Sequence, residues 1–318
     1  GEVYAVTLNP ENADAPLGGT PRLLPREGWP EGKPFQPHGM FYSNATNRLL
    51  VLSHTFQPLG PPECPECGSF VEIFEVLREP LRLKYIESIT SELFGTCVIN
   101  DVVEGRNADE MFITTWLWYP KPMNGSKNPM SIKTFLQQKA SLLALFTKQT
   151  HLIRCLRSSD SWSCSIARDA GYAHQFNGIA INTKRDTIFT VDSVARKFYQ
   201  YTITPKGALV KQREIETPHM IDNIDYVHGT GDLVLGSIPV GYKALSKLER
   251  DPHAIVPGGY LRFEGSEEKG YTLAEDLVHD GTALSMISMA QGWGDYVLLG
   301  SPNSHGIATC KRRRATPS

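Results

Sequence analysis

The sequence predicts an all-β fold in which small sheets repeat around an axis, a β-propeller. Most segments are short, β-prone and separated by Gly, Pro, Asn or Asp, which is typical of strands joined by turns. Two similar motifs, at Asn177 and Asp222, lie 45 positions apart, close to the roughly 40–45-residue period of four-stranded blades. A third motif, at Asn100, precedes Asn177 by 77 positions, which corresponds to two blades or to one blade with an insertion. Radial repetition explains this spacing better than a sandwich does.

The predicted strands run along the whole chain. In each of them apolar residues alternate with polar ones, or form a short apolar run bounded by turn residues. The segments with this pattern are Glu2–Leu8, Arg48–Ser53, Phe70–Leu77, Met111–Thr115, Thr187–Asp192, Lys197–Thr204, Asp232–Gly236, Gly259–Glu264 and Tyr296–Gly300.

One segment, Pro129–Lys148, has helical periodicity instead, with Lys and Gln between its apolar residues. We predict a helical insertion at about 129–148, packed on the main fold as an amphipathic surface helix. A lid over a pocket or a membrane-contacting helix is the alternative. The chain from residue 1 to 310 is expected to form a single propeller domain. Residues 311–318 are expected to form a basic tail that is simply solvated, with contact to an anionic surface as the minority interpretation.

Composition restricts the class of partner. The 32 basic and 34 acidic residues nearly balance, so the chain has no broad positive field and nucleic acid is not expected to bind. No apolar run approaches the roughly 20 residues that span a bilayer. We expect a small-molecule substrate. Peripheral contact with a membrane or lipid particle is compatible with the sequence. The oligomeric state is not predicted.

Cysteine spacing and glycosylation sequons favour the secretory pathway or an extracellular location. Cys155 and Cys164 bracket a polar loop, and either close a hairpin by a disulfide or remain thiols. Cys64 and Cys67 lack a second ligand pair, so a local disulfide or free thiols are favoured over a zinc site. Two N-glycosylation sequons begin at Asn44 and Asn124.

Three short motifs place amide and carboxylate side chains at the start of apolar strands. Asn and Asp are depleted in strands, so their recurrence among residues that favour burial indicates oxygens gathered around one point. Calcium takes about six to eight oxygen ligands and accepts neutral amides beside carboxylates. Each Asn alone is more often a turn residue, but the set favours ligation. The motifs are Ile99–Val103, Phe176–Ile181 and Ile221–Tyr226.

The order of the motifs resembles the paraoxonases, a family of calcium-dependent lactonases and arylesterases. The resemblance covers nearly the whole chain and implies a six-bladed propeller with two calcium ions in its tunnel. Chance similarity is unlikely because the segments occur in the family's order. They are Pro37–Met40, Leu49–His54, Phe70–Phe74, Ile99–Val102, Phe176–Ile179, Ile221–Ile224 and Leu298–Gly300 with Cys310.

The resemblance also implies roles for individual residues. The catalytic ion would polarise a lactone or ester carbonyl and stabilise the oxyanion that develops. His38 would deprotonate the attacking water, and His54 would orient it or relay the proton. His174 and His305 have no motif support. The catalytic ion would be held by Asn100, Asn177, Asp222 and Asn223, and the structural ion by Asp101 and the backbone carbonyl of Met40.

The chain departs from the family pattern in three places. It begins at Gly1, after the acidic pair of the family's first blade, so we expect a truncated N-terminus, an incomplete first blade and weaker calcium sites. Cys310 lies where the family closes its ring by a disulfide to an N-terminal cysteine, which this chain lacks. Thr115 and Trp116 stand where the family often carries an Asp-His pair, which predicts a more apolar pocket wall.

The expected function is calcium-dependent hydrolysis of lactones and aryl esters by a carboxylic-ester hydrolase. No Gly-x-Ser-x-Gly elbow, phosphate-binding glycine loop or His-Glu-x-x-His helix competes with it. One alternative is a non-enzymatic propeller of the same type, acting as a membrane-associated assembly factor. Another is a sugar-lactone hydrolase with a different divalent metal, which would not need the pair formed by His38 and His54.

Overall fold

The structure of the chain is a computed structural model. It describes residues 1–8, 17–55, 68–96, 98–117, 147–241, 243–244, 251, 253–302, 304 and 306–311. Several predictions lie wholly or mostly outside these residues: the helix at Pro129–Lys148, the pair Cys64 and Cys67, the sequon at Asn124, His305 and the basic tail. The chain divides into two compact units, Gly1–Val6 with Gly19–Gly178, and Thr7–Gly18 with Ile179–Ser318.

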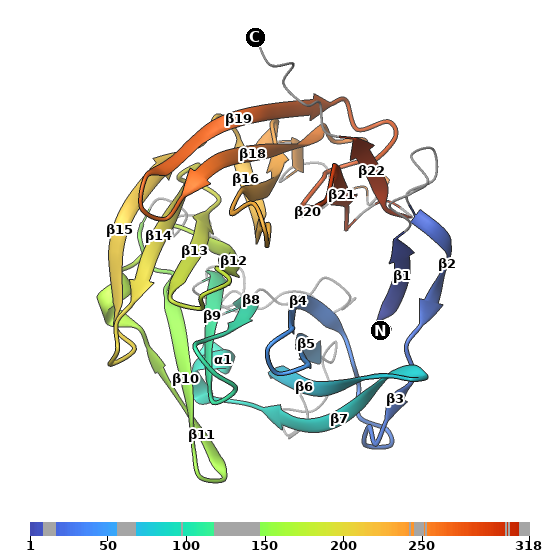
Figure 1. The fold of residues 1–318 in the computed structure, drawn as a ribbon, viewed down its shortest axis with the longest axis vertical. Coiled ribbons are helices and arrows are strands. Elements are labelled where there is room, and N and C mark those ends of the chain that lie inside the picture. The colour runs from blue at the N-terminus through green and yellow to red at the C-terminus, as the bar shows by residue number, and fades with distance from the viewer. Residues whose placement is uncertain are drawn as a thin grey trace, which may run out of the picture. The chain divides into compact units, whose positions relative to one another are not determined.

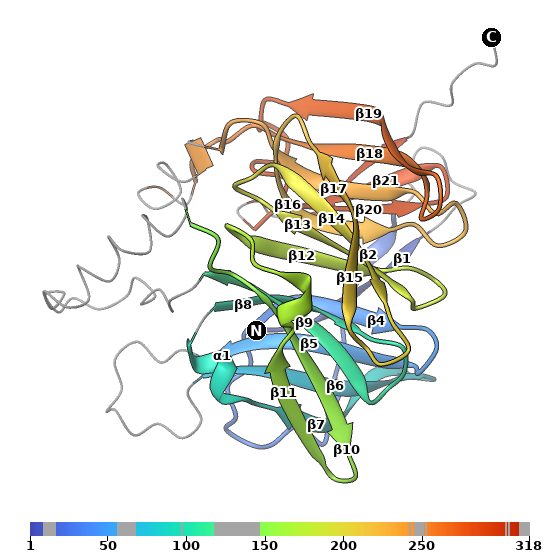
Figure 2. The same ribbon diagram turned by 90° about the vertical axis from the view of Figure 1, so that its left-hand side faces the viewer.

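The first unit contains two sheets whose antiparallel strands follow chain order. The short helix α1 (Glu92–Thr96) joins them and lies at the start of β8 (Figure 2). The first sheet comprises β4 (Pro37–Ser43), β5 (Arg48–Thr55), β6 (Gly68–Arg78) and β7 (Leu81–Ile89), with β3 (Arg26–Glu27) parallel to β7. The second comprises β8 (Val98–Glu104), β9 (Glu110–Leu117), β10 (Leu152–Ser158) and β11 (Ser161–Ile166).

The second unit repeats the same meander (Figure 1), and the boundary between the units falls within β12, after Gly178. A short 3₁₀ turn, Arg168–Ala170, precedes β12. One sheet comprises β12 (Phe176–Ile181), β13 (Thr187–Asp192), β14 (Lys197–Ile203) and β15 (Leu209–Glu216). The next comprises β16 (Met220–Tyr226), β17 (Leu233–Ile238), β18 (Gly258–Ser266) and β19 (Gly270–His279). The last comprises β20 (Met289–Trp293), β21 (Tyr296–Gly300) and β22 (Ala308–Lys311).

The predicted fold class, an all-β propeller built of small meandering sheets, is confirmed. The number of blades differs from the expected six. Five sheets in the described part of the chain have three to five strands, and β1 (Tyr4–Leu8) pairs only with β2 (Leu17–Leu23). The described strands therefore give five blades and one two-stranded sheet.

Apolar residues from neighbouring sheets form the core of each unit. In the first unit Leu52 of β5 and Val71 of β6 belong to one buried cluster with Ile99 of β8 and Ile153 of β10. In the second unit β13 and β17 are buried along their whole length, as expected of central strands that are covered on both faces. This packing supports the edge strands β4, β8, β12 and β16, which carry most of the predicted site residues.

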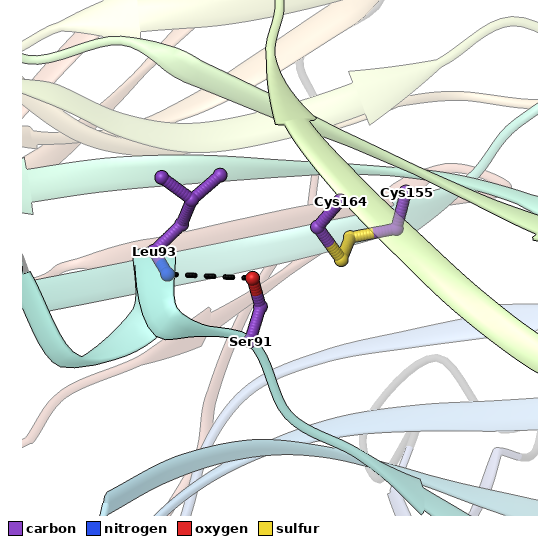
Figure 3. Close-up of a disulfide and its surroundings, with 4 residues drawn as sticks. All are labelled: Ser91, Leu93, Cys155 and Cys164. Carbon is purple, nitrogen blue, oxygen red and sulfur yellow. Dashed lines mark hydrogen bonds between the residues drawn. A yellow bond between two sulfur atoms is a disulfide. The ribbon is translucent and has the colours of Figure 1, made fainter.

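The pair Cys155 and Cys164 forms a disulfide, which decides the alternative that the sequence left open. The two residues face each other across β10 and β11. The segment between them is not a polar loop as expected, because both strands continue to the turn at Ser159, whose φ is 56°. Figure 3 shows the sulfur atoms near Leu93, whose backbone N–H donates to Ser91 Oγ at 3.3 Å.

Candidate functional site

Three of the predicted motifs lie in β-bulges at the edge strands of their sheets. In β4, His38 and Gly39 stand opposite the single residue Leu52 of β5, because the register shifts between Pro37 and Met40. Such a bulge breaks the alternation of side chains and re-aims those that it contains. A β-bulge therefore occurs at each of these three motifs, which the sequence analysis predicted to be catalytic or metal-binding. The other two bulges hold Asn100 and Asp101 opposite Thr114, and Asp222 and Asn223 opposite Gly236.

The bulge of β4 lies directly against the bulge of β8. A Cβ atom placed on Gly39 would lie 2.5 Å from the carbonyl oxygen of Asn100 and 2.7 Å from Asp101 Oδ1. Only glycine permits so close an approach of two backbones. The contact places the neighbours of Gly39, His38 and Met40, beside the predicted ligands of β8. The side chain of Met40 is half exposed, so its backbone carbonyl is the group relevant to a metal.

We expect Gly39→Ala to destabilise the fold by about 1–3 kcal/mol, because the added methyl group must displace the backbone of β8. It should also weaken calcium binding, since Asp101 moves with that backbone. The measurement is urea unfolding with and without calcium. Met40→Ala is the matched control on the same strand: it keeps the carbonyl and should change neither quantity appreciably. Equal stability of Gly39→Ala and the wild type would contradict the close contact.

The two predicted histidines form a hydrogen-bonded chain with a serine. His38 Nδ1 lies 3.0 Å from His54 Nε2, and His54 Nδ1 lies 3.0 Å from Ser69 Oγ, the residue opposite His54 in β6. When His54 Nδ1–H donates to Ser69, His54 Nε2 accepts the Nδ1–H of His38. His38 Nε2 then keeps its lone pair. In this tautomer His38 is available as a base, and His54 with Ser69 orients it.

Desolvation by the surrounding protein favours the neutral form of both histidines. It lowers the pKa of His38 below its usual value, although His38 is accessible to solvent. For His54, burial and the nearby His38 lower the pKa from 6.5 to about 4. A neutral imidazole is the form that can accept a proton from water.

The lowered pKa of His54 predicts a loss of stability in mild acid. As the pH falls from 6.5 towards 4, the unfolded chain takes up a proton that the folded chain excludes, so the free energy of unfolding decreases. For this shift the loss is on the order of 3 kcal/mol. Urea unfolding in chelator across this pH range should show a smaller loss for His54→Gln than for the wild type. An identical pH dependence of the two proteins would contradict the assignment.

Asn177 has a buried amide oxygen that suits a ligand. It lies in β12 and is 5% exposed, and its buried Oδ1 has no hydrogen-bond partner among the described residues. Such an orphaned amide oxygen is costly unless a ligand pairs with it. Asn100 is similarly buried, at 6% exposed. Neutral amide oxygens of this kind fit a hard cation such as calcium.

In the second unit, Asn223 is held by its amide nitrogen. Asn223 Nδ2 donates to the carbonyl of Ser288 at 3.0 Å, and its backbone N–H donates to the same oxygen at 3.1 Å. Gly236, opposite this bulge, permits the approach, since its Cβ would lie 2.3 Å from that oxygen. The anchored nitrogen fixes the orientation of the carboxamide and leaves Oδ1 for a ligand. Asp222 precedes it in the bulge and is partly exposed.

The structure brings some of the predicted site residues into contact, and leaves others to be described separately. In the first unit it brings His38 to His54, and the bulge of Gly39 to that of Asn100 and Asp101. Asp222 and Asn223 lie in the second unit and are described there by themselves. No group of three or more His, Cys, Asp or Glu side chains suited to a metal occurs in the ranges that the structure covers. Any ion there would need amide or backbone ligands.

Sequence reasoning missed the residues that support the site. Ser69, Gly236 and Ser288 belong to no motif, and each becomes relevant only through pairing with a distant strand. Gly39 offered a signal, because a glycine within a strand pattern often marks a bulge or a close backbone approach. Thr115, expected to line the pocket, is buried, and its hydroxyl donates to the carbonyl of His151 at 2.8 Å.

Comparison with known proteins relates the chain to ester and lactone hydrolases. The family model described as Arylesterase matches residues 164–310. The chain is 24% identical over 305 residues to serum paraoxonase/lactonase 3 of Oryctolagus cuniculus, covering 95% of this chain and 74% of that protein. It is 22% identical over 270 residues to serum paraoxonase/arylesterase 2 of Bos taurus, covering 84% and 66%. The matches thus cover 74% and 66% of the length of these two relatives.

Solved structures are similar in fold. A candidate 6-phosphogluconolactonase from Bacteroides fragilis has a TM-score of 0.51 and 10% identity, and the match covers 98% of this chain and 73% of that one. A hypothetical selenium-binding protein from Sulfolobus tokodaii has a TM-score of 0.50 and 10% identity, with coverages of 91% and 68%. At this identity the likeness concerns the fold alone.

Proposed function

Because the chain is a relative of the paraoxonase and arylesterase family, we propose that it is a calcium-dependent hydrolase of lactones and aryl esters. The observation that carries the proposal is the chain from Ser69 through His54 to His38, on a strand whose bulge lies against Asn100 and Asp101. A poised base beside oxygen ligands suits metal-assisted hydrolysis of a carbonyl group.

We propose that the ligands of catalytic calcium are Asn100 and Asn177 in the first unit and Asp222 and Asn223 in the second, and that Asp101 and the carbonyl of Met40 hold a second, structural ion. The orphaned Oδ1 of Asn177 and the anchored carboxamide of Asn223 support this assignment. When bound, the first ion supplies a positive charge that polarises the carbonyl of the substrate. The protein contributes ligands held in rigid bulges. With few carboxylates, the set is expected to bind calcium weakly, because affinity follows ligand charge and site rigidity.

The histidines perform the proton transfer. His38 Nε2 accepts a proton from the attacking water, and the Nδ1–H of His38 strengthens its hydrogen bond to His54 Nε2 as positive charge develops. His54 can take that proton while its Nδ1–H stays hydrogen-bonded to Ser69 Oγ. When the leaving alkoxide or phenoxide departs, the same chain returns the proton. Burial of His54 shields that end of the chain of hydrogen bonds from bulk water.

The substrate is a small molecule and the chain acts in the secretory pathway or outside the cell. The disulfide between Cys155 and Cys164 suits an oxidising compartment, and two of the relatives carry the word serum in their names. Asn44, the first residue of a sequon, is exposed at the turn between β4 and β5, where a glycan could be attached. No helix in the described ranges is long and apolar enough to span a membrane.

The test is hydrolysis of a panel of aliphatic lactones and phenyl esters, first with calcium and then with a chelator. We expect turnover of at least one of the two classes with calcium and its loss in chelator, with recovery when calcium returns. A chain that binds calcium and hydrolyses nothing in the panel would contradict the enzyme and favour the non-enzymatic propeller. Turnover restored equally by other divalent ions would favour the sugar-lactone hydrolases instead.

A further inference from the structure

His151 is a buried histidine that belongs to none of the motifs. It lies immediately before β10 and is 8% exposed. Its Nε2 has no hydrogen-bond partner among the residues that the structure describes. Buried polar atoms nearly always form a hydrogen bond with protein or ordered water. A buried ring nitrogen without such a bond is therefore a candidate for binding a ligand. The function proposed above does not use this residue.

The surroundings of His151 favour one position for its ring proton. The nearby backbone of Gln149 raises the pKa of the ring, although burial, the larger effect, leaves the pKa below its usual value. A backbone group that raises the pKa of an imidazole accepts a proton from it. Since Nε2 is unpaired, Nδ1 is the donor in this bond. The neutral ring therefore presents a lone pair on Nε2, which can only accept a hydrogen bond.

Two threonines connect this segment to the strands of the candidate site. Thr115 Oγ1 accepts the N–H of His151 at 2.7 Å, and Thr115 pairs with Ile99, the residue before Asn100. These bonds fix the backbone of His151 relative to the bulge of β8.

The second threonine makes the corresponding link to β12. Thr150 Oγ1 accepts the N–H of Phe176 at 2.9 Å and donates to the carbonyl of Ala173 at 3.0 Å. Phe176 immediately precedes Asn177, the residue with the orphaned oxygen. The segment of Thr150 and His151 is therefore bonded to both strand starts of the first unit that carry predicted calcium ligands.

Strand pairing also places His151 on the face of its sheet that packs towards the histidine pair. His151 precedes Ile153 by two positions along an extended segment, so the two side chains share a face. Ile153 belongs to the buried cluster with Leu52 and Val71, which lie two positions from His54 and Ser69. The ring of His151 contacts only one described aromatic ring, that of Tyr172, edge to face at 6.2 Å, and Tyr172 is 47% exposed.

We propose that Nε2 of His151 accepts a hydrogen bond from a hydroxyl group of the substrate, so that the enzyme prefers hydroxylated lactones to unsubstituted ones. This inference rests on the proposed lactone hydrolysis. The carbonyl and ring oxygens of a lactone are acceptors and cannot pair with another acceptor. A hydroxyl substituent is the donor that such a substrate can bring. A site with an unpaired buried acceptor discriminates against the analogue that leaves it unpaired.

The test compares kcat/KM for 2-hydroxy-γ-butyrolactone and γ-butyrolactone. We expect the wild type to prefer the hydroxylated lactone by roughly tenfold or more. His151→Leu should remove the preference, so that the ratio of the two kcat/KM values falls to about one. His151→Gln should keep part of it, since its amide oxygen can accept, and His253→Leu, at an exposed site, should keep all of it. An unchanged ratio in His151→Leu would overturn the proposal.

A second readout separates this inference from the proposed function. If the wild type hydrolyses neither lactone, the enzyme proposal fails, and binding of the corresponding lactams, 3-hydroxy-2-pyrrolidinone and 2-pyrrolidinone, is measured by calorimetry. Tighter binding of the hydroxylated lactam that is lost in His151→Leu would support the role of His151. Equal affinity of the wild type for the two lactams, or a preference that survives in His151→Leu, would overturn it. Thermal unfolding establishes that each variant is folded.

Discussion

Replacing His38 with glutamine is expected to lower kcat for lactone and ester hydrolysis by about 10²–10⁴-fold, the usual contribution of a positioned general base. Glutamine can still bond His54, but it cannot take a proton from water near neutral pH. Of the four ring nitrogens of His38 and His54, His38 Nε2 is the one whose lone pair is not used in this arrangement of hydrogen bonds. The measurement is steady-state hydrolysis of a phenyl ester at saturating calcium, with the variant and wild type compared.

Calcium binding separates a chemical role of His38 from a structural one. We expect His38→Gln to bind calcium as the wild type does, because the metal ligands from the same strand are backbone groups. His253→Gln, at an exposed position, is the control and should retain full turnover. A His38→Gln protein that keeps wild-type kcat would show that another group activates the water.

Replacing Asn177 with alanine is expected to raise the dissociation constant for calcium by more than about 100-fold. Mutation of residues that only support a metal ligand typically weakens metal binding by roughly 10–100-fold, and loss of a ligand should cost more. The reason is the loss of an oxygen that is buried and otherwise unpaired. Turnover should fall with calcium occupancy and recover partly at high calcium. The measurement is a calcium titration by calorimetry, followed by the rate at each calcium concentration.

A second buried asparagine provides a matched control with the opposite expectation. Asn182 is 2% exposed, and its Oδ1 accepts the N–H groups of Asp186 and Thr187 at 3.0 and 3.1 Å. Asn182→Ala should therefore lose about 1–3 kcal/mol of stability and bind calcium normally. Asn177→Ala in chelator should lose little stability, since its oxygen has no partner to lose. If the two variants behaved alike, Asn177 would be an ordinary structural residue.

Inner strands could be predicted from the sequence and outer strands could not. Thr187–Asp192 and Tyr296–Gly300 match β13 and β21 at both ends, because buried apolar runs between turn residues leave little choice of structure. The prediction missed β15 and β19, whose residues are largely polar and exposed. Such strands form because their backbones pair with the adjacent central strand of the sheet. This pairing is a long-range effect that the local sequence does not contain.

Local motifs located the candidate residues but not their geometry. The order of the motifs identified Asn100, Asn177 and Asn223, because amides at apolar strand starts are unusual. The bulges that re-aim Asn100 and Asn223 depend on the partner strands β9 and β17. The serine that completes the histidine chain, Ser69, is fixed only by its pairing with His54. Contacts of this kind arise from the tertiary fold, so no single segment predicts them.

The most direct test of the account compares two calcium titrations of the same chain, one of binding and one of ester hydrolysis. If the ion held by Asn177 is the one that assists the reaction, the concentration that half-activates hydrolysis equals the dissociation constant. Asn177→Ala then shifts both by the same factor, whereas His38→Gln lowers the maximal rate and shifts neither. Hydrolysis that persists in chelator would contradict the account. So would an Asn177→Ala variant in which the dissociation constant for calcium changes but the calcium concentration for half-activation does not.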